Sequence, residues 1–281
     1  MGQAFSMRCL GLVVGALAWA GCASHEAAPV APAPPPAPAP VVTAAAGGEP
    51  VGLTPGETMA FEVKIAGIAA GEAQLAVGEI GEFHGRRAVV VKSHAETVGV
   101  VAMARHIVDE ATTVIDFESG RPLTLETMYE QNDQRATASA TFTGNVAEII
   151  YRPPGNKPPR TQKVDFGTTV LDAHAAMAQL RGWRPARGAR RTVFVVSGRR
   201  PWRIDVTAVG DDTIGSAIGN RHATRFTGEA YHTRRDLSPE TARPARTFTV
   251  WLSDDADRVP LKLTATTELG EITMDLTEYT R

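Results

Sequence analysis

Cysteine is nearly absent from the sequence: its 281 residues include only Cys9 and Cys22. Cys9 lies in a short apolar stretch near the start, so a disulfide framework is not expected in the rest of the chain. Aromatic residues are also scarce, at 6%. Stability must therefore come from a core of mainly aliphatic side chains, and the chain is long enough to bury one.

Signatures of common catalytic and metal sites are missing as well. The sequence has no Gly-x-Ser-x-Gly elbow and no glycine-rich phosphate loop before a helix. Its histidines do not show the tight spacing of a metal-ligand pair, whether His94 and His106 near Asp109, or His222 and His232. We therefore predict no catalytic residue, no metal site and no cofactor.

One hydrophobic run stands out, and it is too short to be a membrane helix. Residues 9–20 carry no charge and follow Arg8, whereas a spanning helix needs about 20 apolar residues. This pattern is typical of a signal peptide. Ala20 and Gly21 precede Cys22 as in a lipoprotein cleavage site, although Trp19 stands where leucine is usual. We predict a signal peptide over 1–21 and lipid attachment at Cys22; the alternative is an ordinary secretory signal.

The next segment is rich in alanine and proline. Residues 22–52 include eight prolines, three of them consecutive at 34–36. Proline removes amide donors and favours an extended chain, so this segment is expected to be a semi-rigid tether. Ala23 follows the cysteine, where an aspartate would favour retention at the inner membrane. The predicted location is therefore the periplasmic side of the outer membrane, and exposure at the cell surface stays open.

Residues 53–281 show the alternation of apolar and polar side chains that is typical of antiparallel strands. Examples are Met59, Phe61, Val63 and Ile65, then Trp202, Ile204 and Val206, and finally Ile272, Met274 and Leu276. About a dozen such runs separated by turn residues favour a single β domain. The predicted fold is mostly β: a curved antiparallel sheet, either an incomplete barrel or a barrel.

One segment departs from this alternation. Leu171, Ala175 and Ala178 recur at helical spacing, between Thr169 as the expected N-cap and Gly182 as the expected C-cap. We predict one short α-helix here, packed on the sheet.

Three blocks of sequence carry a resemblance to a known family. The first contains Gly56-Glu57 and the turn at 67–73, and the second contains Leu171-Asp172 and Leu180-Arg181. The third runs through 251–255, Arg258 and 260–263 to 270–272. Together they resemble the bacterial exported domain-of-unknown-function family numbered 3108. The resemblance implies a periplasmic β domain of unassigned activity, so it adds no chemistry.

The strongest local charge lies between Asp172 and Asp205, where eight arginines occur without an acidic residue, although the chain's formal net charge is −2. Arginine forks bind anionic groups well, so this stretch predicts a basic surface. The candidate ligand-binding residues are Arg190, Arg191, Arg199, Arg200 and Trp202. The alternative is a solvated face whose arginines pair with neighbouring strands.

Two functions stay open at this stage. The domain either binds a lipid or another apolar or anionic envelope ligand, or it docks an envelope protein or glycan through the arginine-rich surface. A hydrolase is a third alternative. A nucleic-acid partner is disfavoured by the predicted periplasmic location, and the oligomeric state cannot be derived from the sequence.

Overall fold

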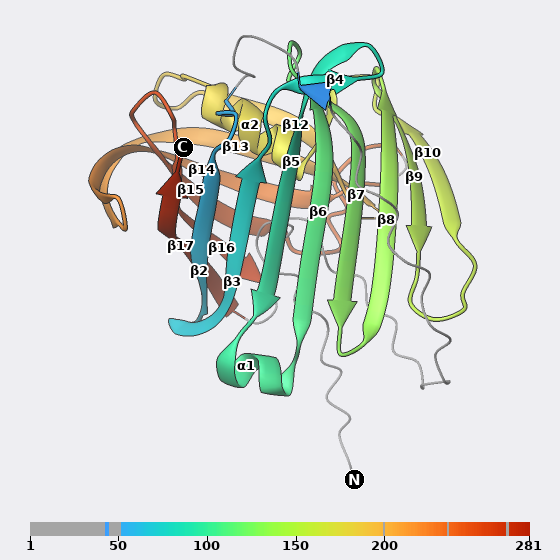
Figure 1. The fold of residues 1–281 in the computed structure, drawn as a ribbon, viewed down its shortest axis with the longest axis horizontal. Coiled ribbons are helices and arrows are strands. Elements are labelled where there is room, and N and C mark those ends of the chain that lie inside the picture. Colours follow the sequence, from blue (N-terminus) through green and yellow to red (C-terminus); the bar gives the residue numbers. More distant parts are fainter. Residues whose placement is uncertain (1–42, 45–51, 199, 235, 268–269) are drawn as a thin grey trace.

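The computed structural model describes residues 52–198, 200–234, 236–267 and 270–281, together with the two-residue strand at 43–44. The predicted signal peptide, Cys22 and most of the predicted tether lie outside the described residues. The described elements, shown in Figure 1, are β1 (Thr43–Ala44), β2 (Thr58–Ile65), β3 (Ile68–Val77), β4 (Gly81–Phe83), β5 (Arg86–Thr97), α1 (Gly99–Ala104), β6 (Ile107–Asp116), β7 (Pro122–Gln131), β8 (Gln134–Thr143), β9 (Val146–Arg152), β10 (Arg160–Asp165), β11 (Val170–Asp172), α2 (Ala173–Gly182), β12 (Arg190–Ser197), β13 (Arg200–Ser216), β14 (Gly219–His232), β15 (Arg246–Ser253), β16 (Pro260–Thr267) and β17 (Gly270–Thr280).

The strands form one continuous, mostly antiparallel sheet that curves on itself. The first half runs from β2 through β3 and β5 to β10, and the second half runs from β12 to β17. The short β11 adds to the edge of β12 as a parallel strand. In the described part of the chain, β10 pairs with β9, β11 pairs with β12 and the short β1 pairs with β4, and the sheet is not closed. The predicted mostly β fold is therefore confirmed in its open form.

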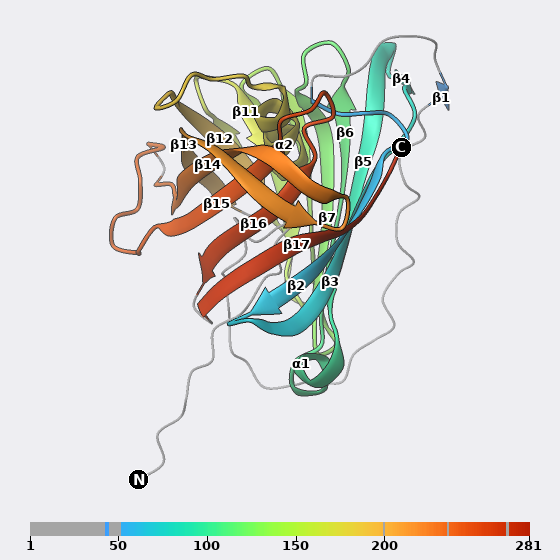
Figure 2. The same ribbon diagram turned by 90° about the vertical axis from the view of Figure 1, so that its left-hand side faces the viewer.

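The two halves are joined by the first and last long strands of the domain. β2 and β17 pair antiparallel, from Ile65 opposite Ile272 to Thr58 opposite Thr280. The inward residues of β2 are the ones that the alternation predicts, since Met59, Phe61 and Val63 are all buried. This pairing forms the seam of the sheet (Figure 2).

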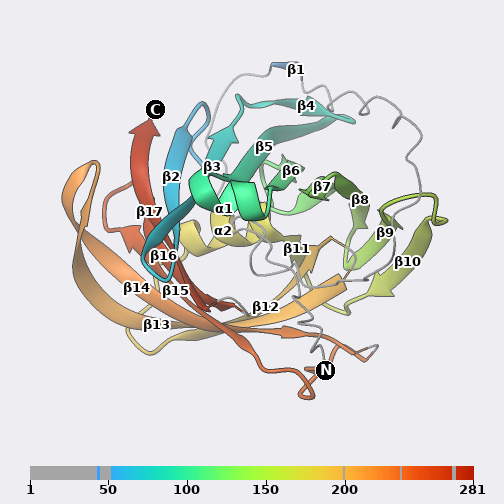
Figure 3. The ribbon, with the colours of Figure 1, turned by 90° about the horizontal axis from the view of Figure 1, so that it is seen from below.

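Helix α2 lies within the curve of the sheet (Figure 3). Its buried residues His174, Ala175, Ala178 and Arg181 recur at three- and four-residue spacing, which places them on one face. The small side chains of Ala175 and Ala178 let the helix backbone approach the sheet closely. They pack in a core cluster with residues of both sheet halves, including Val91.

The structure corrects the expected caps of this helix. Thr169 precedes β11 and is not the N-cap. Asp172 is the N-cap, and its side chain accepts hydrogen bonds from the backbone N–H groups of His174 and Ala175. Gly182 is the last helical residue, and Trp183 is the C-cap. The capping-box pattern misled us because Asp172 satisfies the free donors of the first turn directly.

A second helix was not predicted. Helix α1 is a six-residue helix between β5 and β6, and its first turn has no side-chain cap. Its sequence shows neither an amphipathic repeat nor a capping residue, so the sequence offered no signal for it. Among the described residues, neither helix is long and apolar enough to cross a membrane.

Candidate functional site

Three charged side chains from distant parts of the sequence meet inside the fold. Glu57 precedes β2, Arg181 lies in α2 and Arg258 precedes β16, and each is at most 2% exposed. Arg181 binds Glu57 through both nitrogens, with Nη1 donating to Oε1 at 2.5 Å and Nη2 donating to Oε2 at 2.9 Å. A two-point pair of this kind fixes the orientation of both groups. We call these three residues the ionic cluster.

The hydrogen bonds of the second arginine in the ionic cluster go to uncharged oxygens, and the Asp254 carboxylate lies 3.9 Å from it. Arg258 donates to the Thr224 hydroxyl at 2.8 Å, to the carbonyl of Trp183 at 3.1 Å and to that of Arg181 at 3.3 Å. Burial lowers the pKa of Arg258 to about 10. In turn, Arg181 donates to the carbonyl of Arg258 at 3.1 Å. The cluster therefore fastens the C-terminal end of α2 to β14 and to the segment before β16.

A different set of side chains holds the N-terminal end of α2. The Thr113 hydroxyl on β6 donates to Asp172 and lies 2.7 Å from His174 Nδ1. On the other side of the ring, Nε2 lies 2.9 Å from the Ser93 hydroxyl of β5. Because the Thr113 hydroxyl donates its hydrogen bond to Asp172, its oxygen accepts from His174 Nδ1–H. In the neutral ring, Nε2 then accepts a hydrogen bond from the Ser93 hydroxyl. We call these four residues the polar network.

The polar network contains a serine next to a histidine base, which is the arrangement that activates a nucleophile. Three observations argue against that chemistry here. Ser93 is 7% exposed and His174 is 3% exposed, so a substrate has no path to the hydroxyl in this conformation. Thr113 stands between the carboxylate and the ring, and Asp172 Oδ2 lies 3.8 Å from Nδ1. Burial lowers the pKa of His174, while the nearby Asp172 opposes that shift. The network supports a packing role.

Between its two fastened ends, α2 leaves an apolar crevice against the second half of the sheet. The partly buried edge of α2 carries Ala176, Met177 and Leu180, and these face β12, β13, β15 and β16 across a cavity of about 70 Å³. The apolar side chains on the sheet side are Val193, Val195, Ile204, Val206, Phe248, Val250 and Leu263. We call this space the α2 crevice.

A single cation stands at the edge of the α2 crevice among its lining residues. The guanidinium of Arg191 lies over the ring of Trp183, 4.7 Å from its centroid. Trp183 in turn packs against Phe226, with ring centroids 5.6 Å apart. Alternation along β12 places Arg191 on the same face as Val193 and Val195, so its charge borders the apolar lining. An apolar crevice with one cation at its edge suits an amphiphile with an anionic head.

The predicted ligand-binding residues do not form a single patch. Trp202 is 1% exposed and belongs to the core, where it stacks on His232 with ring centroids 3.8 Å apart. The prediction of Trp202 as a surface ligand contact is therefore wrong. Arg199 and the Arg200 side chain lie outside the described residues. Of the five, Arg190 and Arg191 remain as exposed side chains.

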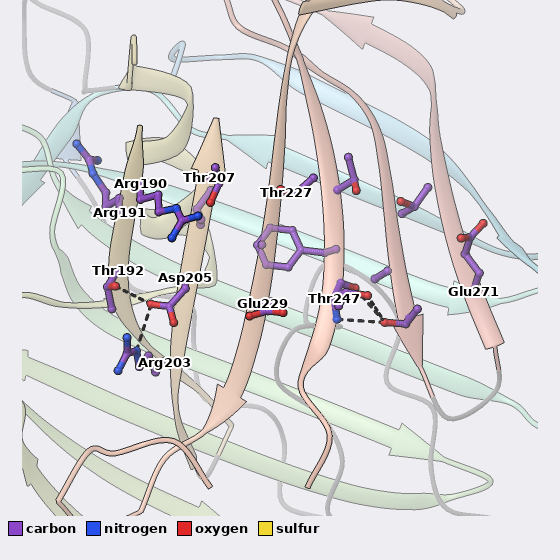
Figure 4. A pocket seen from close by; sticks show the side chains of 17 residues that line it. Arg190, Arg191, Thr192, Arg203, Asp205, Thr207, Thr227, Glu229, Thr247 and Glu271 are labelled. Carbon is purple, nitrogen blue, oxygen red and sulfur yellow. Dashed lines mark hydrogen bonds and ion pairs between the residues drawn. The ribbon is translucent and has the colours of Figure 1, made fainter. Parts of the chain in front are cut away.

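Arg190 and Arg191 also line a wide polar groove over the second half of the sheet (Figure 4). The groove encloses about 740 Å³, but it is not uniformly basic. Arg203 pairs with Asp205 at 3.1 Å, and Asp205 also accepts from the Thr192 hydroxyl at 2.6 Å. The remaining acidic lining residues are Glu229 and Glu271. Three arginines and three carboxylates balance, so the groove does not favour an anionic polymer.

The histidines and Asp109 that were weighed as metal ligands do not converge. His94 lies 3.2 Å from Glu110 on the exposed face, while Asp109 faces the interior. Burial raises the pKa of Asp109 to about 8, with a smaller contribution from Glu110. The described residues contain no group of three or more candidate ligands.

Sequence reasoning missed most of the α2 crevice. Met177 and Leu180 do carry a signal, because with Ala176 they form a second apolar stripe at helical spacing beside the buried one. Ser93 and Thr113 carry no such sequence signal, since a polar residue at an inward strand position cannot be distinguished from an ordinary irregularity in the alternation.

Comparison with one solved structure agrees with this architecture, and two further structures match with lower TM-scores. A "beta-barrel-like" protein of the domain-of-unknown-function family DUF1849 from Brucella abortus has a similar fold, with a TM-score of 0.53 and 9% identity over 85% of this chain and 99% of that chain. A candidate exported protein with a YmcC-like fold from Bacteroides fragilis gives a TM-score of 0.34 at 10% identity, covering 81% and 97% of the two chains. A candidate lipoprotein from Parabacteroides distasonis gives 0.34 at 9% identity, covering 83% and 97%.

The search of curated proteins finds no match. A family model does match, over residues 60–277, and this range holds Arg181 and Arg258 of the ionic cluster together with the polar network and the whole α2 crevice. The predicted resemblance is thus confirmed: the chain belongs to the family described as protein of unknown function DUF3108.

Proposed function

We propose that this domain binds a single slender apolar chain, such as an acyl chain of an envelope lipid, in the α2 crevice, with the anionic head beside Arg191. One observation carries the proposal: an apolar space opens beside a helix that is fixed at both ends, and a cation borders it. Apolar pockets with a few placed polar groups are the usual form of small-ligand sites. The balanced charge of the polar groove gives the glycan or protein alternative less support.

The size of the α2 crevice limits the ligand. A volume of about 70 Å³ is room for about two water molecules, whereas drug-sized ligands occupy pockets of roughly 300 Å³ or more. The crevice must therefore widen when a chain enters. Met177 and Leu180 are only partly buried, and methionine adopts many rotamers, so these side chains are the parts expected to move. A narrow chain fits this limit better than a ring system.

We further propose that the protein is exported and acylated at Cys22, at the periplasmic face of the outer membrane. The support is the sequence alone: the short apolar run, the small residues before the cysteine and the following Ala23. Such an anchor would hold the α2 crevice within reach of the lipids that it is proposed to bind.

Binding of a dansyl-labelled fatty acid to the purified full chain tests the crevice. We expect Val193→Trp to weaken binding by about tenfold or more, since the added ring fills the space. Thr161→Trp, which places the same ring on exposed β10, is the matched control and should bind like the wild type. Arg191→Gln should weaken binding of the acid but not of the corresponding dansyl alcohol. Equal binding by Val193→Trp and the wild type, with no lipid in organic extracts of either, would overturn the proposal.

A further inference from the structure

An exposed apolar surface lies at the opposite end of the sheet from α2. The large apolar side chains with the greatest exposure among the described residues are Ile68 at 64%, Val100 at 72% and Met103 at 89%. Ile68 follows the β2–β3 turn and the other two lie in α1, and Figures 1 and 2 show both segments at the same end. A hydrogen bond from the Val98 N–H to the Ala70 carbonyl, 2.9 Å long, joins the two segments. We call residues 65–71 and 98–104 the apolar tip.

The composition of the apolar tip is as unusual as its exposure. Both segments consist only of glycine, alanine, valine, isoleucine and methionine, so neither has a charged or hydrogen-bonding side chain. The turn itself has positive φ at Ala66 and Gly67, where Asn-Gly is the common choice. Alanine at this position keeps even the turn free of polar side chains. Exposed loops of soluble domains are normally polar, so two adjacent apolar loops indicate a surface that is covered in use.

We propose that the apolar tip inserts into the surface of a phospholipid bilayer. Three large side chains offer far less area than the ~800 Å² that each partner buries in a stable protein complex. They are sufficient for shallow insertion, in which apolar groups enter the outer 5–10 Å or so of a bilayer. Removal of each large apolar side chain from water favours insertion.

The position of the apolar tip is compatible with a chain anchored upstream. Gly52, where the described domain begins, packs against α2, and a Cβ there would lie 1.8 Å from the Ala178 carbonyl oxygen. β2 then carries the chain over 8 residues, or about 26 Å, to the tip. Residues 22–52 would span up to about 95 Å in an extended polyproline conformation. An acylated Cys22 therefore leaves the domain free to turn its tip to the same membrane.

A dye attached at the tip can report on insertion. The full chain carrying Met103→Cys, labelled with an NBD fluorophore, is compared in vesicles of phosphatidylethanolamine and phosphatidylglycerol with Thr161→Cys, labelled in the same way on exposed β10. Any labelling of Cys9 or Cys22 is common to both proteins and cancels in the comparison. We expect severalfold higher, blue-shifted emission at position 103, quenched by lipids that carry nitroxide in the outer acyl region. Position 161 should show neither change.

A second pair of substitutions separates insertion from other causes. Ile68→Ser with Val100→Ser should reduce the quenching at position 103 by at least half, while the thermal unfolding midpoint stays close to that of the parent because both side chains are exposed. The proposal is overturned if the dye at 103 is quenched no more than the dye at 161. It is also overturned if light scattering shows a dimer that these serines dissociate, since the tip would then be an interface between two copies.

Discussion

The two ends of α2 are fastened by different chemistry. At the C-terminal end, the ionic cluster joins segments that lie more than 70 residues apart in sequence, with Arg181 paired to Glu57 and bonded to the Arg258 carbonyl. At the N-terminal end, the polar network uses hydroxyl, imidazole and carboxyl groups from β5, β6 and the helix cap. Between them, the helix faces the second half of the sheet across a mainly apolar crevice. The difference indicates a helix that is rigidly placed at both ends and adaptable in its middle.

The largest effect is expected from the ionic cluster. Arg181→Met removes one partner and leaves Glu57 buried without a counter-charge, a change that typically costs about 3–5 kcal/mol. We expect a loss of that size in the free energy of unfolding, measured by urea denaturation. The double variant Glu57→Leu with Arg181→Met should recover much of it. If the single variant were as stable as the wild type, the cluster would not be what holds this end of α2.

A smaller effect is expected at the polar network. Thr113→Val keeps the shape of the side chain but removes one hydrogen bond from Asp172 and leaves His174 Nδ1 without its partner, and a buried unsatisfied polar group costs about 1–3 kcal/mol. The urea midpoint should fall by less than in Arg181→Met. Thr112→Val, on the next position of β6, is the control and should change the midpoint little. If Thr113→Val lowered the urea midpoint more than Arg181→Met does, the polar network would stabilise the protein more than the ionic cluster, contrary to this prediction.

Acid should loosen the N-terminal end selectively. The pKa of His174 is lowered in the folded protein, so below pH 6.5 the unfolded chain binds a proton that the folded chain does not. The contribution of His174 to the free energy of unfolding is therefore fully present above pH 6.5, and it decreases as the pH falls towards the lowered pKa. His174→Gln should show a flatter dependence between pH 6.5 and 5, although it is less stable at neutral pH. Parallel curves for the two proteins would show that His174 does not titrate as proposed.

The smallest change in stability is expected in the middle of α2. Met177→Ser replaces a partly buried side chain in the α2 crevice, and we expect it to cost less than about 1 kcal/mol. Binding of the dansyl-labelled fatty acid should weaken nevertheless, because the flexible apolar lining is lost. A variant that lost stability like Thr113→Val would show that the middle of the helix is as constrained as its ends.

Much of the fold could be predicted from local patterns. Alternation located strands such as β2, β13 and β17, and helical spacing located α2, because both patterns report which side chains face the core. The pairing of β2 with β17 could not be predicted, since it joins the two ends of the domain and leaves no local trace. The same holds for the ionic cluster: Glu57, Arg181 and Arg258 were all recognised as family residues, but nothing in their spacing brought them together.

The error at Trp202 is more instructive than the successes. Trp202 shares its strand face with Ile204 and Val206, so the alternation already predicted that it points inward. We assigned it to the surface because of the arginines around it. Neighbours along a strand project to opposite faces, and a charge-rich stretch can therefore supply core residues at every second position. The position of Trp202 in the strand alternation was therefore a better guide to the orientation of its side chain than the charge of its neighbours in sequence.

The seam between β2 and β17 has a consequence for how the protein matures. The ribosome synthesises β2 more than 200 residues before β17, so β2 cannot form this pairing until the last strand of the domain has been made. Sheets that depend on such distant pairings form slowly, because the entropy cost of closing a long loop comes before the stabilising contacts are made. Until the final strand is available, the chain has an unpaired edge on β2 and the two half-sheets have no common boundary, so the complete sheet forms only after β17 has been synthesised.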